Sequence, residues 1–192
     1  IDIANSGLLN PISISINACV YYQGGYQNPR IVSKTPQGYE LLINQGSGNV
    51  LYSHINNVAY QSNDTVQLNR WMFISLVKSS DSLKFYSDAV LVHSFTVSGS
   101  ISSNSNILRI GAHAASAVND LFQGKIDDIR IYDRPLSALE IQTLYLENIP
   151  TILSFTPASG PVGTSVTITG TNFKATTPFN IVYFGAVKAA LA

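Results

Sequence analysis

Apolar residues alternate with polar or aromatic ones from residue 11 to residue 22. This two-residue period predicts a strand with one buried face, because neighbouring side chains of a strand point to opposite sides. That face would hold Ile12, Ile14, Ile16, Ala18 and Val20. Further β-type runs follow at 30–34, 39–44, 50–55, 71–78, 82–86, 90–97, 107–110 and 125–132. Turn-forming residues separate these runs, so the pattern predicts an all-β, antiparallel sandwich of many short strands.

One segment near residue 140 has a helical pattern instead. Ser137 and Glu140 have the spacing of a capping box, in which each side chain bonds the other residue's backbone N–H. Leu136 and Ile141 occupy the staple positions on either side of this cap. We therefore expect a short helix over about 138–147, docked on the sandwich through the face that carries Ile141, Leu144 and Tyr145.

A second unit begins after Pro150. A strand is expected at 151–156 and an alternating strand at 164–169, with a turn rich in Pro and Gly between them. A disulfide-free β unit below roughly 40 to 60 residues buries too little surface to be stable alone. The sequence thus predicts one domain at 1–148 and a partial second domain at 149–192.

Composition excludes several classes of protein. The chain is 45% hydrophobic and 11% charged, with a net charge of zero. Nucleic-acid binders normally carry a basic excess, and disordered chains are poor in apolar residues. No apolar run approaches the roughly 18 to 20 residues that span a bilayer, so we expect no membrane insertion. Cys19, the single cysteine, excludes an intrachain disulfide and is better explained as a small apolar filler than as a reactive thiol.

Residues 122–141 read FQGKIDDIRIYDRPLSALEI. This stretch closely resembles the C-terminal signature of the laminin-G-like, concanavalin A-like jelly-roll family. Shorter matches occur upstream in the expected order, at 16–21, 30–34, 69–71, 83–88 and 109–111. The resemblance spans about residues 2–146 and implies an antiparallel jelly-roll β-sandwich with one short C-terminal helix.

Three departures from the family pattern concern local structure. Cys19 stands where the family usually has Trp, and Ala89 stands where Gly often follows Asp88. From the resemblance we also expect the family's opening strands to be missing before Ile1, which would remove half of any metal site. We expect the first two departures to alter packing and one turn, and not the fold.

The tail from Pro150 to Phe173 resembles the immunoglobulin-like IPT/TIG domain, most clearly at GTSVTITG over 163–170. We expect this part to be a partial immunoglobulin-like sandwich. Such modules are common spacers in bacterial secreted or surface-anchored proteins. The resemblance therefore implies an extracellular or cell-surface location.

Catalytic residues are hard to find in this chain. Glycoside hydrolysis needs two carboxyl groups about 5 to 9.5 Å apart. None of the three glutamates forms such a pair. Glu140 belongs to the capping box, Glu147 lies at the end of the expected helix, and Glu40 stands alone on a strand. Asp127 and Asp128 are adjacent and are expected on opposite faces. The three histidines lie in separate segments, at His54, His93 and His113. We expect no enzymatic activity.

Asp127 is the candidate metal ligand. It has the strand parity of Ile129 and Ile131, so its carboxylate is expected on or beside a buried face, where it needs a partner. Similar jelly-roll modules hold a structural calcium through an acid on this strand, and Ca²⁺ accepts such oxygen ligands. The alternative is that Asp127 bonds turn amides or pairs with Arg109 or Arg130.

Aromatic residues are the candidate ligand contacts. Tyr21, Tyr22 and Tyr26 surround the turn at 24–25, and Tyr52 and Tyr60, with His54, form a second group. Tyrosines near strands also serve in core or cross-strand packing, which is the alternative for both groups. The family resemblance places Trp71 inside the sandwich.

Together these features favour a non-catalytic recognition or adhesion module of a larger bacterial protein. Its expected partner is a glycan or an extracellular protein, and its oligomeric state is unknown. An accessory domain or degenerate fold of a carbohydrate-active enzyme, and a structural spacer, are the alternatives.

Overall fold

The computed structural model describes residues 1–192 except 26–27, 117–119, 148, 174–181, 185–186 and 190–192. The chain divides into two compact units, Ile1–Gln142 and Thr143–Ala192. This division lies close to the predicted boundary at 148/149. Each unit is described separately.

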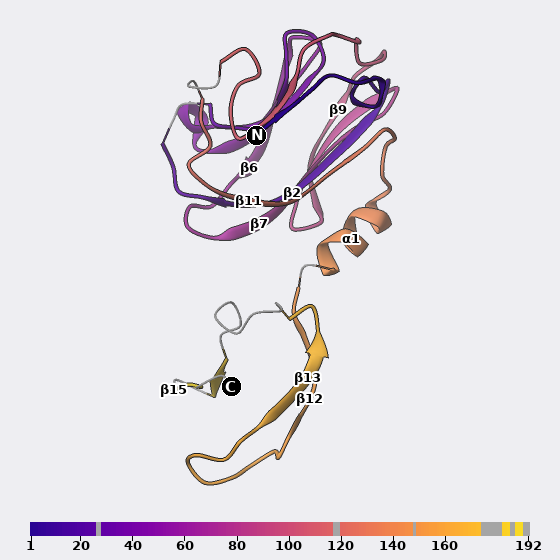
Figure 1. Ribbon diagram of the computed structural model, residues 1–192. Coiled ribbons are helices and arrows are strands. Elements are labelled where there is room, and N and C mark those ends of the chain that lie inside the picture. Colours follow the sequence, from indigo (N-terminus) through magenta and orange to yellow (C-terminus); the bar gives the residue numbers. More distant parts are fainter. Residues whose placement is uncertain (26–27, 117–119, 148, 174–181, 185–186, 190–192) are drawn as a thin grey trace. The chain divides into compact units, whose positions relative to one another are not determined.

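The first unit is a sandwich of two antiparallel sheets (Figure 1). In spatial order, the six-stranded sheet holds β1 (Asp2–Ile3), β10 (Leu108–Ile110), β3 (Arg30–Lys34), β4 (Tyr39–Asn44), β5 (Val50–Ile55) and β6 (Val58–Thr65). The five-stranded sheet holds β11 (Gly124–Tyr132), β2 (Ile14–Tyr22), β7 (Trp71–Lys78), β8 (Ser82–Ser87) and β9 (Val90–Thr96). Short 3₁₀ helices lie at Gly7–Leu9 and Gln45–Ser47. The all-β, jelly-roll-like fold is confirmed.

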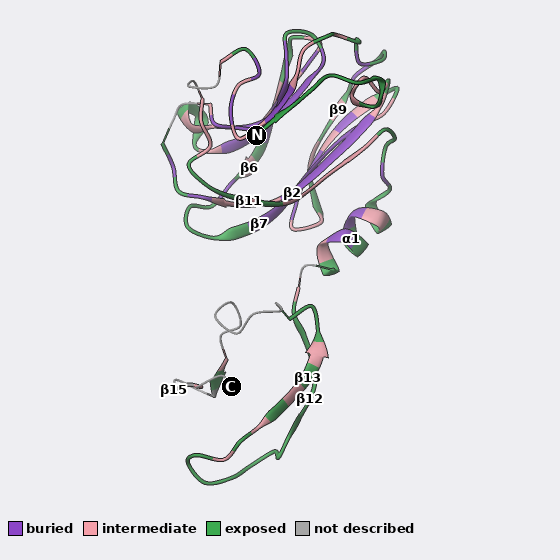
Figure 2. Ribbon diagram, in the orientation of Figure 1, coloured by how far each residue is buried: buried purple, intermediate pink, exposed green. Residues whose placement is uncertain are grey.

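The core lies between the two sheets, and apolar side chains from both sheets fill it. Figure 2 marks the buried residues along these strands. On β2, Ile14, Ile16, Ala18 and Val20 are fully buried, which confirms the period read from the sequence. Ile12 precedes the strand and is exposed. Other large core side chains are Tyr39, Leu41, Ile43, Leu51, Ile74, Leu76, Leu83 and Phe85. Burial of these apolar faces is the main force that holds the sheets together.

Strand β6 was not predicted from the sequence. It pairs with β5 through a two-residue turn at Asn56 and Asn57, which have φ of 52° and 65°. Two consecutive positive φ values are typical of the tight hairpin turn that Asn tolerates. β6 lies at the edge of its sheet and is mostly polar and exposed, so it lacks a continuous apolar pattern.

The parity assigned to Asp127 was wrong because β11 contains a β-bulge. The register against β2 shifts between Asp127 and Arg130, and Asp128 has a φ of 48°. The extra residue places Ile126 and Ile129 on the core side together, while Asp127 is exposed. A bulge reverses the inside–outside alternation beyond it, which a strict two-residue period does not allow.

Trp71 is also placed differently from the expectation. Its side chain is 45% exposed because the core-facing residues of β7 are the even-numbered Met72 and Ile74. Its ring lies 5.8 Å from that of Tyr21 on the outer face of the five-stranded sheet.

The helix α1 (Ala138–Leu146) begins where the capping box predicted and ends one residue early. Glu140 accepts a hydrogen bond from the Ser137 N–H at 2.8 Å, and the Ser137 hydroxyl accepts one from the Glu140 N–H at 3.3 Å. Leu136 and Ile141 are both buried. Both halves of the predicted cap are thus confirmed.

Lys34 at the end of β3 is fully buried. Its ammonium donates to the side-chain oxygens of Asn5 at 2.9 Å and Asn104 at 2.8 Å, and to the carbonyl oxygens of Asn104 at 3.2 Å and Asn106 at 2.8 Å. Burial lowers the pKa of this amine. The lysine thereby joins β3, the N-terminal segment and the loop before β10.

The second unit contains the hairpin of β12 (Thr151–Thr156) and β13 (Thr167–Thr171), followed by β14 (Tyr183–Phe184) and β15 (Val187–Lys188). The first strand has the predicted bounds, and the second begins three residues later than predicted. Every residue of β12 is exposed, including Leu153 and Phe155. This hairpin therefore contributes little buried apolar surface of its own.

Candidate functional site

Polar side chains gather on the outer face of the six-stranded sheet, where β3, β4 and β5 lie side by side. On β4, Tyr39, Leu41 and Ile43 face the core, so Glu40 and Asn44 face outward. Glu40 pairs with His54 on β5, and with Ser33 on β3. The pairing register of these strands therefore brings polar residues of β3, β4 and β5 together.

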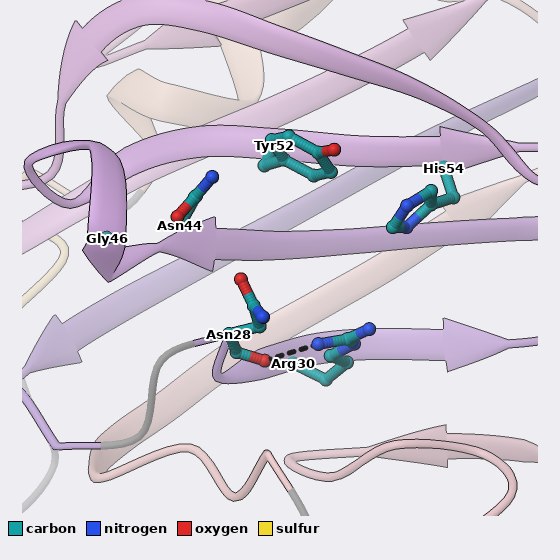
Figure 3. Close-up of a pocket in the computed structure, with 6 residues that line it drawn as sticks. All are labelled: Asn28, Arg30, Asn44, Gly46, Tyr52 and His54. Carbon is teal, nitrogen blue, oxygen red and sulfur yellow. Dashed lines mark hydrogen bonds between the residues drawn. The ribbon is translucent and has the colours of Figure 1, made fainter.

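A pocket of about 420 Å³ opens on this face. It is lined by Asn28, Arg30, Asn44, Gly46, Tyr52 and His54 (Figure 3). Asn44 and Tyr52 come from neighbouring strands, and Gly46 comes from the 3₁₀ turn that joins them. The Tyr52 and His54 rings meet edge to face, with 5.2 Å between their centres.

Arg30 forms one wall of the pocket and is held by two carboxylates. Its Nη1 lies 3.0 Å from Asp120 Oδ2 and donates to the Asn28 carbonyl at 2.7 Å. Its Nη2 and Nε contact the two oxygens of Glu40 at 3.4 and 3.5 Å. The side chains of Arg30 and Glu40 are 8% and 2% exposed, so this ion pair is buried.

Glu40 is ionised despite its burial. Desolvation raises its pKa. The hydrogen bond from His54, the charge of Arg30 and hydrogen bonds from Ser33 and Thr35 together lower the pKa by a larger amount. The net result is a pKa of about 2. The carboxylate accepts from His54 Nδ1 and from the Thr35 hydroxyl, both at 3.0 Å. Every one of these donors stabilises the charged form.

The hydrogen bonds also fix the ring nitrogens of the two nearby histidines. A carboxylate only accepts, so His54 Nδ1 carries the proton that faces Glu40, and in the neutral ring Nε2 is an acceptor. His113 Nδ1 accepts the Ala115 N–H at 3.1 Å, so its proton lies on Nε2, 3.7 Å from Glu40. Both neutral rings thus point an N–H toward the same carboxylate.

The structure separates the five tyrosines named from the sequence. Tyr52 lines the pocket, whereas Tyr60 packs inward against Phe95, with 5.4 Å between ring centres. Tyr22 is fully buried against Phe122. Tyr21 is half-buried on the other sheet. Tyr26 lies outside the described residues. Ligand contact by any of the five stays a prediction.

Tyr21 belongs to a second group, on the outer face of the five-stranded sheet. Lys125, Tyr21 and Trp71 occupy one row across β11, β2 and β7. The Lys125 ammonium lies 5.7 Å from the Tyr21 ring centre, and the Tyr21 and Trp71 rings are tilted by 58°. The row exposes aromatic surface, but the tilt leaves no single flat platform.

Asp127 lies on the same outer face. Its carboxylate accepts the N–H of Asp128 at 2.9 Å. Within the described part of the chain, no group of three or more His, Cys, Asp or Glu side chains is arranged to hold a metal ion. Calcium binding at Asp127 stays a prediction.

The buried network around Glu40 was missed in the sequence. Glu40 was read as solitary, and His54 and His113 were read as scattered. A signal was present: Glu40 interrupts an otherwise apolar strand, and a charge in such a place requires a partner. The partners Arg30 and His54 lie in the two adjacent predicted strands, but Asp120 is distant in sequence.

Comparison with protein families agrees with this architecture. The model of the concanavalin A-like lectin/glucanases superfamily matches residues 1–142. The chain belongs to this superfamily. Residues 150–191 match the IPT/TIG domain. Both resemblances read from the sequence are confirmed. No curated protein sequence matches the chain.

Several solved structures share the fold. A candidate carbohydrate-binding protein from Bacteroides ovatus is 16% identical with a TM-score of 0.63, over 73% of this chain and 42% of that one. Domain 4 of an extracellular arabinanase from Geobacillus stearothermophilus, in complex with arabinotriose, is 17% identical with a TM-score of 0.59, over 72% and 69%. A sialidase CBM40 domain from Ruminococcus gnavus, bound to sialyllactose, is 13% identical with a TM-score of 0.61, over 75% and 91%.

Among the described residues, no helix has the length and apolar character needed to span a membrane.

Proposed function

We propose that the first unit is a non-catalytic recognition module that binds glycan in the pocket between β3, β4 and β5. The observation that carries this proposal is the pocket's lining, which combines amides, a tyrosine and a histidine. Amides and hydroxyls match the hydroxyl groups of sugars, and the Tyr52 ring offers an apolar surface.

The structural relatives support a binding role. Two of them were solved with arabinotriose or sialyllactose bound, and both are parts of enzymes or their binding domains. By analogy, the module would serve a larger secreted or cell-surface protein. An accessory domain of a carbohydrate-active enzyme is compatible with the same pocket, because such domains bind glycan without cleaving it.

The electrostatics of Glu40 argue against hydrolysis in this pocket. A general acid needs a raised pKa so that it holds a proton at working pH. Glu40 has a pKa of about 2 and is buried against Arg30. It therefore has no proton to donate at neutral pH. Asp120 is also bound to Arg30, so both nearby carboxylates have a structural role.

A glycan array followed by titration of the bound glycans tests the proposal. Tyr52→Ala should weaken binding about fivefold or more, because truncation of a hot-spot aromatic contact costs over about 1 kcal/mol. Tyr21→Ala is the matched control, since it removes a half-buried tyrosine from the other sheet. Thermal melting should show both variants folded.

Loss of binding in Tyr21→Ala with retention in Tyr52→Ala would move the site to the row of Lys125, Tyr21 and Trp71. Absence of glycan binding by the unaltered protein would overturn the proposal and favour a spacer or a protein partner.

A further inference from the structure

The guanidinium of Arg30 is the natural place for an acidic ligand to bind in this pocket, yet four of its five N–H donors are already used. Four hydrogen bonds occupy it, to the Asn28 carbonyl, to Asp120 and twice to Glu40. To bind the guanidinium through two parallel hydrogen bonds, an incoming carboxylate or sulfate would have to displace Asp120, since Glu40 lies beneath the surface. That exchange gains little, because one carboxylate simply replaces another.

The local charge also opposes an anion. Arg30 contributes one positive charge, while Glu40 and Asp120 contribute two negative ones. His54 and His113 add no charge in their neutral forms. With both rings neutral, the network carries a net charge of about −1 beside the pocket, and like charges in a partly buried site repel strongly.

The other lining groups are uncharged but retain hydrogen-bonding capacity. Asn44 donates to Gln61 at 3.2 Å through its amide nitrogen, which leaves its carbonyl oxygen for a ligand. His54 Nε2 is an acceptor in the neutral ring, and the Tyr52 hydroxyl both donates and accepts. These groups pair with hydroxyls, and they offer an anion no positive charge.

We infer that the pocket selects neutral glycans and discriminates against sialylated, uronic and sulfated ones. This inference rests on the proposed function and specifies the class of ligand. Two observations support it. The N–H donors of Arg30 are mostly bonded already, and the network holds one more carboxylate than guanidinium.

An array of neutral glycans and their acidic counterparts, read at pH 8, tests the inference on the whole chain. Suitable matched probes are lactose with sialyllactose, and fully methyl-esterified with free oligogalacturonate. We expect the bound set to be neutral and the acidic partner of each bound glycan to bind at least about tenfold more weakly. A bound set dominated by acidic glycans would overturn the inference while leaving glycan binding intact. Binding to no glycan would overturn both proposals.

Asp120→Asn separates charge from shape, because the amide keeps an acceptor for Arg30 while it removes one negative charge. We expect its affinity ratio for acidic over neutral glycan to rise at least about threefold. Asp127→Asn makes the same charge change on the other sheet and should leave the ratio unaltered. Equal ratios in both variants and the unaltered protein would show that the network does not set the selectivity. If Asp120→Asn fails to fold, the wild-type array still decides the outcome.

Discussion

The outer faces of the two sheets are built on different principles. On the six-stranded sheet, charged residues from two strands and a distant loop form a buried network beside a pocket. On the five-stranded sheet, Lys125, Tyr21 and Trp71 form a row of exposed or half-buried side chains. The comparison teaches that aromatic density along the sequence does not locate a pocket. The buried ion pair holds neighbouring strands in a fixed arrangement, whereas the row of Lys125, Tyr21 and Trp71 only adds accessible aromatic surface.

The largest expected change in stability comes from removing one carboxylate from each face. Glu40→Ala leaves Arg30 with only one of its two carboxylate partners, and breaking a buried ion pair typically costs about 3–5 kcal/mol of unfolding free energy. Asp127→Ala, its control, removes an exposed carboxylate and should change stability by about 0.5 kcal/mol or less. Urea unfolding at pH 7 measures both. Similar small losses would mean that the network does not stabilise the first face, and Glu40→Gln serves if the alanine variant does not fold.

Acid should weaken the same network. The folded-state pKa of Glu40 is about 2, below its ordinary 4.5, so its contribution is complete above about pH 4.5 and is lost as pH falls toward 2. The loss is on the order of 3 kcal/mol. Urea unfolding between pH 7 and pH 2.5 should show a steeper decline for the wild type than for Glu40→Gln. Parallel declines would contradict this assignment.

The smallest expected effect concerns the five-stranded sheet. Ala89 has a φ of 62° in the turn between β8 and β9, a conformation that costs a residue with a Cβ about 1 kcal/mol. Ala89→Gly should therefore raise the unfolding free energy by up to about 1 kcal/mol. Ala59→Gly, in β6, is the opposite control and should lower it. Thermal unfolding distinguishes the two, and a loss of stability in Ala89→Gly would show that the turn is not strained.

Much of the fold could be predicted because burial imposes a simple period. The strand from Ile14 to Tyr22 follows it directly, and the cap of α1 follows from side chains close in sequence. β6 was not predicted because an edge strand need not bury one of its faces. Asp127 was misplaced because one extra residue in β11 reversed its parity.

The pocket was harder to predict because its parts are distant in sequence. Tyr52, Tyr60 and His54 were named as one possible group; Tyr52 and His54 line the pocket, whereas Tyr60 packs against the core. Arg30 and Glu40 were visible as charges in apolar strands, yet their pairing depends on hairpin register. Asp120 reaches Arg30 across 90 positions, a contact that no local pattern encodes.

Lys34 has a consequence for how the loops around the six-stranded sheet stay closed. Its ammonium is a positive charge surrounded by oxygens from Asn5, Asn104 and Asn106. Because this ammonium group is covalently part of β3, neither a chelator nor dilution can remove it. The N-terminal segment and the loop before β10 are thus fastened by the chain itself, at any ion concentration outside.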